Sequence, residues 1–210
     1  MDLNTAAFVF SIVISAVATI VSDYQGQRWL TYFFRPFTIL LIIGLLFEAR
    51  PASFYRNAIL IGLIFSLLGE VMMMLKKKKF LAGFVSFLVS QIAFAVAFYS
   101  RLSPRFLTWP VIPLVLVAGV VLFLIWPDLG GRRLPVIFYL AAILTMTRLA
   151  LELPHQLSGY QPWLAATGAV LFFLSDVLIA LNLFHRPFAK AQIFILSAFY
   201  LSLLLIALSV

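Results

Sequence analysis

The fold of this chain is decided by a stretch of ten residues, Gly62-Leu-Ile-Phe-Ser-Leu-Leu-Gly69-Glu70-Val71. A second stretch repeats its frame, Gly168-Ala-Val-Leu-Phe-Phe-Leu-Ser175-Asp176-Val177. In both, a small residue is followed by six residues, a second small residue, an acid and a valine. Each acid lies inside an apolar run long enough to cross a bilayer. An ionisable side chain is costly at that depth, so each acid indicates a functional site.

The composition is that of an integral membrane protein. Hydrophobic residues make up 64% of the chain, charged residues 10%, and the mean hydropathy is +1.13. A soluble domain is about half apolar and about a quarter charged. The first apolar run, from about Thr5 to Val21, lacks the basic flank and cleavage site of a signal peptide, so it is read as the first span. The chain has no cysteine and two distant histidines, so we expect no disulfide, no metal and no cofactor.

The apolar runs predict an all-α integral membrane protein with eight transmembrane helices. A helix rises ~1.5 Å per residue and must cross a core of ~30 Å. The connections are short and contain Pro, Gly or charged residues, and none is long enough for a soluble domain, so residues 1–210 form one transmembrane domain. The predicted spans cover about residues 5–22, 32–48, 54–75, 80–100, 106–126, 134–153, 162–183 and 188–209.

The positive charge predicts how the helices are oriented. The net charge of +8 sits in short loops between apolar spans, which favours the lipid bilayer as partner and excludes nucleic acid. Eight spans put both termini on one side; ten Lys and Arg residues then lie on the opposite side, and five on the terminal side. We therefore expect a multi-pass protein of a bacterial inner membrane, with the four-lysine loop Lys76–Lys79 cytoplasmic and the termini exterior.

The matched stretches also predict an internal repeat of two parallel four-helix halves. Such halves are related by an axis along the membrane normal, which would place Glu70 and Asp176 at the same depth, facing each other. The alternative is that Gly-x6-Gly and Gly-x6-Ser are ordinary close-packing faces of membrane helices.

Glu70 and Asp176 are the candidate catalytic residues. Glu70 lies six residues before Lys76 and Asp176 lies nine residues before His185, so both lie near the predicted cytoplasmic surface. A lipid headgroup could reach them there while its chain stays in the bilayer. The alternative is that each acid pairs with an arginine or hydroxyl of a neighbouring span.

Further polar residues of the spans are candidates for substrate binding. Arg35 opens the second predicted span and could hold a phosphate or a carboxylate, or could be a surface anchor. Ser66 lies one turn before Glu70 on the same helix face. Arg148 could reach a substrate or pair with Glu152, one turn away.

Four more candidates lie in the fourth, seventh and eighth predicted spans. Gln91 is a buried amide close to Ser86 and Ser90, which are typical of a packing seam. In the seventh span Asn182 shares a face with Ser175; it could orient a ligand or water, or cap the helix end. Tyr200, like Tyr139 in the sixth span, is a possible proton donor, although a buried aromatic role is favoured for both.

With these motifs the chain resembles the YhhN-like transmembrane family, the lysoplasmalogenases, over nearly its whole length. The resemblance rests on Arg35-Pro36, Gly69-Glu70, Phe80-x2-Gly83-x3-Phe87 and Leu174-Ser-Asp-Val-Leu-Ile-Ala-Leu-Asn182. It implies eight helices and a lysophospholipid substrate, whose vinyl ether bond is hydrolysed to a fatty aldehyde and a glycerophospho-base. The implied catalytic pair is Glu70 and Asp176.

Three positions differ from the family pattern. The first acid is usually Asp, where this chain has Glu70; span four commonly carries His, where it has Gln91; span two commonly begins with Lys, where it has Arg35. Moving a carboxylate by about an ångström can cost on the order of a hundredfold in rate.

Vinyl ether hydrolysis requires a proton donor for the β-carbon and a carboxylate that stabilises the oxocarbenium ion and activates water. Paired carboxylates serve a related transition state in glycosidases. We expect Glu70 to be the general acid, Asp176 the base, and Arg35 the phosphate ligand. One alternative is a proton-coupled carrier of a small solute or lipid that uses the same acids. Another is a structural membrane protein in which the acids only hold helices together.

Overall fold

The structure is a computed structural model that describes residues 3–49, 52–75, 80–103 and 111–210. These residues form eight long α-helices and no β-strand, and all eight helices are long and apolar enough to cross a membrane. The eight-helix, all-α prediction is therefore confirmed, and the protein is a multi-pass membrane protein. The helices are α1 (Leu3–Tyr24), α2 (Arg28–Ala49), α3 (Phe54–Met74), α4 (Phe80–Tyr99), α5 (Val111–Ile125), α6 (Arg133–Gln156), α7 (Gln161–Ala180) and α8 (Ala191–Leu208).

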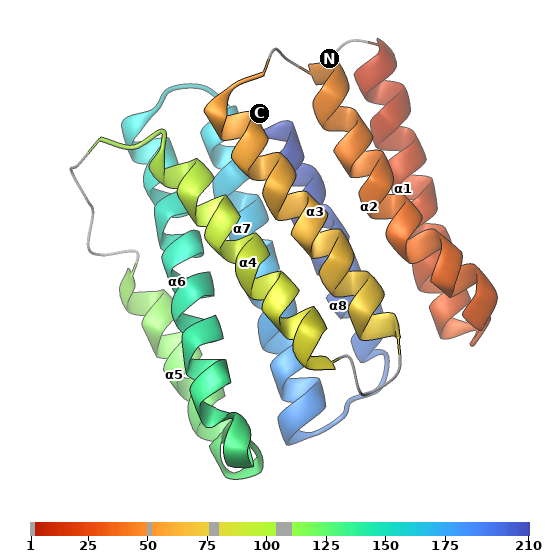
Figure 1. Ribbon diagram of the computed structural model, residues 1–210, viewed down its shortest axis with the longest axis vertical. Helices are drawn as coiled ribbons and strands as arrows, with labels where there is room; N and C mark the ends of the chain where they lie inside the picture. Colours follow the sequence, from red (N-terminus) through yellow and green to blue (C-terminus); the bar gives the residue numbers. More distant parts are fainter. Residues whose placement is uncertain (1–2, 50–51, 76–79, 104–110) are drawn as a thin grey trace.

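The helices form one antiparallel bundle (Figure 1). In this view α3 and α4 cross in front of α7 and α8, with α1 and α2 on one side and α5 and α6 on the other. The N- and C-termini lie at the same end, as the even number of spans predicts. The turns α1–α2, α5–α6 and α7–α8 lie at the opposite end, called here the loop end.

The outer surface is apolar. Large side chains point outward, including Phe123, Trp29 and Phe10, which are 80%, 77% and 68% exposed. A soluble monomer rarely exposes apolar patches larger than a few hundred Å². Lipid must therefore cover this surface.

The hairpin of α3 and α4 is packed closely through small residues. A Cβ on Gly62 would overlap the ring of Phe94, and one on Gly69 would come within 2.8 Å of Phe87. Between these glycines the Ser66 hydroxyl is hydrogen-bonded to the Ser90 hydroxyl on α4, with 2.7 Å between the two oxygens. Small and hydroxyl-bearing residues thus let the backbones approach, as is common in membrane helices.

The hairpin of α7 and α8 is packed in the same way. A Cβ on Gly168 would lie 2.9 Å from the carbonyl oxygen of Ser202. The Ser175 hydroxyl donates to the carbonyl oxygen of Ile195 at 3.1 Å. In each hairpin the acid directly follows the last small residue of the seam. The repeat of two halves stays a prediction, and these matched contacts support it.

Several helix boundaries differ from the predicted spans. Helix α2 begins at Arg28 because the turn before it is tight, with Gly26 at φ +69°. Pro36 consequently lies inside the helix, and Arg35 lies about two turns from its start rather than opening it. Helix α7 continues into a π-helical turn, η4 (Leu181–His185), and α8 begins only at Ala191.

Two other sequence predictions lie outside the described residues. The predicted start of the fifth span, at about residue 106, falls in the range 104–110. The four-lysine loop occupies residues 76–79.

Candidate functional site

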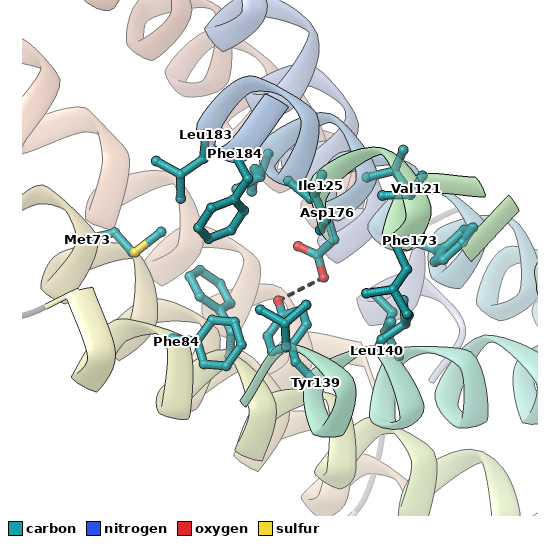
Figure 2. Close-up of a pocket in the computed structure, with 17 residues that line it drawn as sticks. Met73, Phe84, Val121, Ile125, Tyr139, Leu140, Phe173, Asp176, Leu183 and Phe184 are labelled. Carbon is teal, nitrogen blue, oxygen red and sulfur yellow. Dashed lines mark hydrogen bonds between the residues drawn. The ribbon is translucent and has the colours of Figure 1, made fainter. Parts of the chain in front are cut away.

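The carboxyl group of Asp176 is held by two donors from neighbouring helices. The Tyr139 hydroxyl, on α6, donates to Oδ2 of Asp176 at 2.8 Å. Gln91 Nε2, on α4, donates to the same Oδ2 at 2.9 Å. Figure 2 shows the Tyr139 bond, with the second oxygen of Asp176 directed into the open space between the side chains. The carboxyl plane is therefore fixed from two sides.

Asp176 lies at the border of an apolar cavity of about 90 Å³. Among the described residues that line this cavity, only Asp176 and Tyr139 carry polar side-chain atoms. The walls come from α3, α4, α5, α6, α7 and η4. They are formed by Met73, Phe84, Phe87, Val121, Leu122, Ile125, Val136, Tyr139, Leu140, Ile143, Phe173, Asp176, Val177, Ile179, Ala180, Leu183 and Phe184. Such a space suits a hydrocarbon chain.

Glu70 belongs to a chain of charged groups. Arg35 Nη1 donates to Oε1 of Glu70 at 3.1 Å, and Arg35 Nη2 donates to Oδ1 of Asp23 at 3.0 Å. The exposed fractions of the Glu70 and Arg35 side chains are 8% and 14%. Arg35 thus joins α1, α2 and α3 through two ion pairs, and it uses both of its terminal nitrogens to do so.

A second cavity, of about 260 Å³, contains both acids (Glu70 and Asp176) in its lining. Its other polar lining groups are Arg35, Asn182 and Gln192. Gln192 is exposed and lies in the first turn of α8, and because the α7–α8 turn lies at the loop end, this polar cavity lies toward that membrane surface. Glu70 and Asp176 thus line one cavity, and their role as a catalytic pair stays a prediction.

The polar and apolar cavities adjoin each other at Asp176. The residues common to both linings are Met73, Phe87, Asp176, Ile179 and Leu183. A molecule that occupies both spaces would pass the Asp176 carboxyl. Its apolar part would lie among α4, α5, α6 and α7, and its polar part beside Glu70 and Arg35.

Two predicted binding residues lie in helix contacts instead. The Ser66 hydroxyl faces Ser90 on α4, and the Ser175 hydroxyl faces the α8 backbone. Both side chains are fully buried. Their hydroxyl groups contribute to the close packing of the two hairpins, because a serine is small enough to form a hydrogen bond there without separating the helices.

The other predicted binding residues are spread more widely. Tyr200, on α8, lies near Glu70, Arg35 and Thr19, within the charged end of the site. Asn182 lines the polar cavity, and its Oδ1 accepts from the N–H of Phe188 at 3.3 Å, so it also closes the turn after α7. Arg148 is absent from the lining of both cavities and lies nine residues along α6 from Tyr139, about 13 Å away.

Sequence reasoning missed two residues of this arrangement. The sequence offers Tyr139 as a possible proton donor but favours a buried aromatic role for it, and it does not single out Asp23. One signal for Tyr139 exists in the repeat. Tyr139 precedes Asp176 by 37 residues, and Arg35 precedes Glu70 by 35. The two separations differ by only two residues. Each acid is thus hydrogen-bonded by a side chain of the preceding helix, Glu70 by Arg35 and Asp176 by Tyr139. Within the described residues, no group of three or more His, Cys, Asp or Glu side chains could hold a metal ion.

Comparison with known proteins places the chain in a family. The model of the YhhN family matches residues 30–210, which include every residue that lines the two cavities. This chain belongs to the YhhN family.

The relatives of this YhhN-family protein carry two kinds of name. The uncharacterized membrane protein YhhN of Escherichia coli O6:H1 is 28% identical over 179 residues, 85% of this chain and 86% of the relative. Lysoplasmalogenase TMEM86A of Bos taurus is 31% identical over 175 residues, 81% of this chain and 71% of the relative. Lysoplasmalogenase TMEM86B of Homo sapiens is 27% identical over 183 residues, 86% of this chain and 75% of the relative. No solved structure matches this YhhN-family protein.

Proposed function

We propose that this protein hydrolyses the vinyl ether bond of a lysoplasmalogen, releasing a fatty aldehyde and a glycerophospho-base. The observation that carries the proposal is the position of Asp176, at the point where an apolar cavity meets a polar cavity that also contains Glu70. A lysoplasmalogen has its vinyl ether at the junction of its hydrocarbon chain and its polar glycerophosphate. With the chain in the apolar cavity, that bond lies beside Asp176.

The chemistry needs two carboxyl groups with different tasks. One gives a proton to the β-carbon of the vinyl ether, which produces an oxocarbenium ion. The other stabilises the positive charge and activates the water that captures it, as paired carboxylates do for glycosides. Glu70 and Asp176, on one cavity, supply such a pair.

The headgroup would lie toward the loop end. Arg35, Asn182 and Gln192 line the polar cavity there. Arg35 already binds two carboxylates, so its role toward a phosphate is that of a nearby positive charge rather than a free bidentate ligand. The names of the TMEM86A and TMEM86B relatives support the same substrate class.

The test is aldehyde release from a lysoplasmalogen by the purified protein in detergent. Glu70→Gln and Asp176→Asn should each reduce release by at least a hundredfold, because each removes one of the two groups that the reaction needs. Glu152→Gln is the matched control: Glu152 is also buried, on α6, but lines neither cavity. It should retain activity.

The substrate control is a lysophospholipid with a saturated alkyl ether. It has the same shape but no double bond to protonate, so it should be bound and not cleaved. Full activity in either acid variant, or cleavage of the saturated ether, would contradict the proposal.

A further inference from the structure

The environment of Asp176 differs from that of Glu70 in one respect that bears on their roles. The two donors to Asp176, Tyr139 and Gln91, are neutral, and both bind the same oxygen. Glu70 is bound by the guanidinium of Arg35. An arginine–carboxylate pair is an interaction of the two charged forms.

The two neutral donors determine which oxygen of Asp176 would carry a proton. An acid oxygen that accepts two hydrogen bonds has its lone pairs engaged, so the proton of a neutral carboxyl group belongs on the other oxygen. That oxygen, Oδ1, is the one directed into the cavity (Figure 2). Apart from Tyr139, the other side chains that line this apolar cavity carry no polar group, which favours a neutral group on that side of Asp176.

Both donors are themselves held in place. The ring of Tyr139 is stacked on Phe84 with 4.4 Å between ring centroids. Gln91 is fully buried. Since the donors come from α6 and α4 and the acid from α7, three helices together set the direction of the Asp176 carboxyl group.

We propose that Tyr139 and Gln91 are positioning residues that bind Oδ2 of Asp176, so that Oδ1 delivers the proton to the vinyl ether. Glu70, paired with Arg35, is then the carboxylate that activates water. This inference rests on the proposed function, and it reverses the roles expected from the sequence, where Glu70 is the acid.

The steps balance without a further reactant. Oδ1–H of Asp176 protonates the β-carbon, and the ether oxygen shares its electron pair with the α-carbon to form the oxocarbenium ion. Water adds to the α-carbon while Glu70 takes its proton, which gives a hemiacetal. The bond between the hemiacetal carbon and the glycerol oxygen then breaks, and the hemiacetal hydroxyl returns a proton to Asp176 as it becomes the aldehyde carbonyl. The proton on Glu70 passes to the leaving glycerol oxygen, so that both acids are restored.

One test does not depend on activity. Infrared difference spectra of the parent protein against Asp176→Asn should contain a protonated carboxyl C=O band. In Tyr139→Phe this band should move to higher frequency, because Oδ2 loses a hydrogen bond, and Gln91→Met should move it in the same direction. An absent band would show that Asp176 is ionised, and an unmoved band would show that the donors do not hold it. Either outcome would overturn the inference.

The kinetic test separates positioning from stability. Tyr139→Phe should lower kcat about 10- to 100-fold with little change in KM, since a misdirected donor slows the chemical step. The matched control is Tyr55→Phe, because the Tyr55 hydroxyl is also buried and hydrogen-bonded, to Ser209 at 2.7 Å, away from both cavities. It should retain kcat. A loss in Tyr139→Phe no greater than in Tyr55→Phe, or one confined to KM, would refute positioning.

The two tests also distinguish the inference from the proposed function. If the parent protein releases no aldehyde while the band is present and shifts in both variants, the proposed function fails and the geometry of Asp176 stands. If the parent is active and the band does not shift, the function stands and the positioning roles fail.

Discussion

At the scale of single residues, Arg35 is the charged centre of the site. It joins Asp23 and Glu70 through ion pairs of 3.0 and 3.1 Å. Removing one partner of a buried pair leaves a charge without compensation and costs about 3–5 kcal/mol, whereas replacing the whole pair by apolar groups is often close to neutral. Stability and activity should therefore respond differently to single and double substitutions.

We predict that Arg35→Met lowers the unfolding temperature in detergent, because it leaves Glu70 and Asp23 without their cation. The double variant Arg35→Met/Glu70→Met should recover most of the lost stability, since the buried carboxylate is then removed as well. Thermal unfolding monitored by circular dichroism measures both.

Activity should not follow the same course. The double variant lacks Glu70 and should remain inactive although it is folded. Recovery of activity together with stability would show that the Arg35–Glu70 pair has a structural role only.

At the scale of the helices, the two closely packed hairpins carry the two acids. The seam of α7 and α8 is the less adaptable one, because a Cβ on Gly168 meets the Ser202 backbone. In the seam of α3 and α4, a Cβ added to Gly62 meets the Phe94 side chain instead. A side chain can change its rotamer to make room, whereas the helix backbone cannot.

Gly168→Ala should therefore destabilise the protein by about 1–3 kcal/mol, the usual cost of overpacking. Gly119→Ala is the matched control, since a Cβ there meets nothing within 4 Å on the lipid-facing helix α5. It should be neutral or slightly stabilising, because alanine favours helix. Equal unfolding temperatures for the two variants would contradict the close seam.

Helix α5 forms one wall of the apolar cavity through Val121, Leu122 and Ile125. Val121→Phe should narrow the space for a hydrocarbon chain. We predict that the ratio of kcat/KM for a short-chain over a long-chain lysoplasmalogen rises at least tenfold, since each methylene group that no longer fits is worth about 1–3 kcal/mol. An unchanged ratio would show that the hydrocarbon chain of the substrate does not occupy this cavity.

At the scale of the whole molecule, hydrophobicity and length were sufficient to predict the eight helices. Each span must be apolar over about 20 residues, and this signal is local in sequence. The acids could be found for the same reason, since Glu70 and Asp176 interrupt apolar runs. Their partners could not be found so directly. Tyrosine is common in membrane helices, so Tyr139 does not stand out in the sequence. Its hydrogen bond to Asp176 depends on how α6 packs against α7, and no local sequence pattern encodes that packing.

The orientation of the protein remains a prediction. Because the chain has no cysteine, single cysteines can report it. Asp128 and Ser158 are exposed, Asp128 in the α5–α6 turn at the loop end and Ser158 in the α6–α7 turn at the end of the termini, and each is replaced by cysteine. A membrane-impermeant maleimide added to intact cells should label Ser158→Cys alone, and should label Asp128→Cys only after permeabilisation. The reverse pattern would invert the topology.

The most direct measurement of the central claim is the mass of the aldehyde released from a lysoplasmalogen in D₂O. If an enzyme carboxyl group protonates the β-carbon, the aldehyde carries one solvent deuterium on the carbon next to its carbonyl. Asp176→Asn should form this product at no more than the uncatalysed rate. Release of aldehyde without that deuterium, or the same rate in Asp176→Asn, would contradict the mechanism. An absence of any aldehyde from the folded parent protein would contradict the proposed function itself.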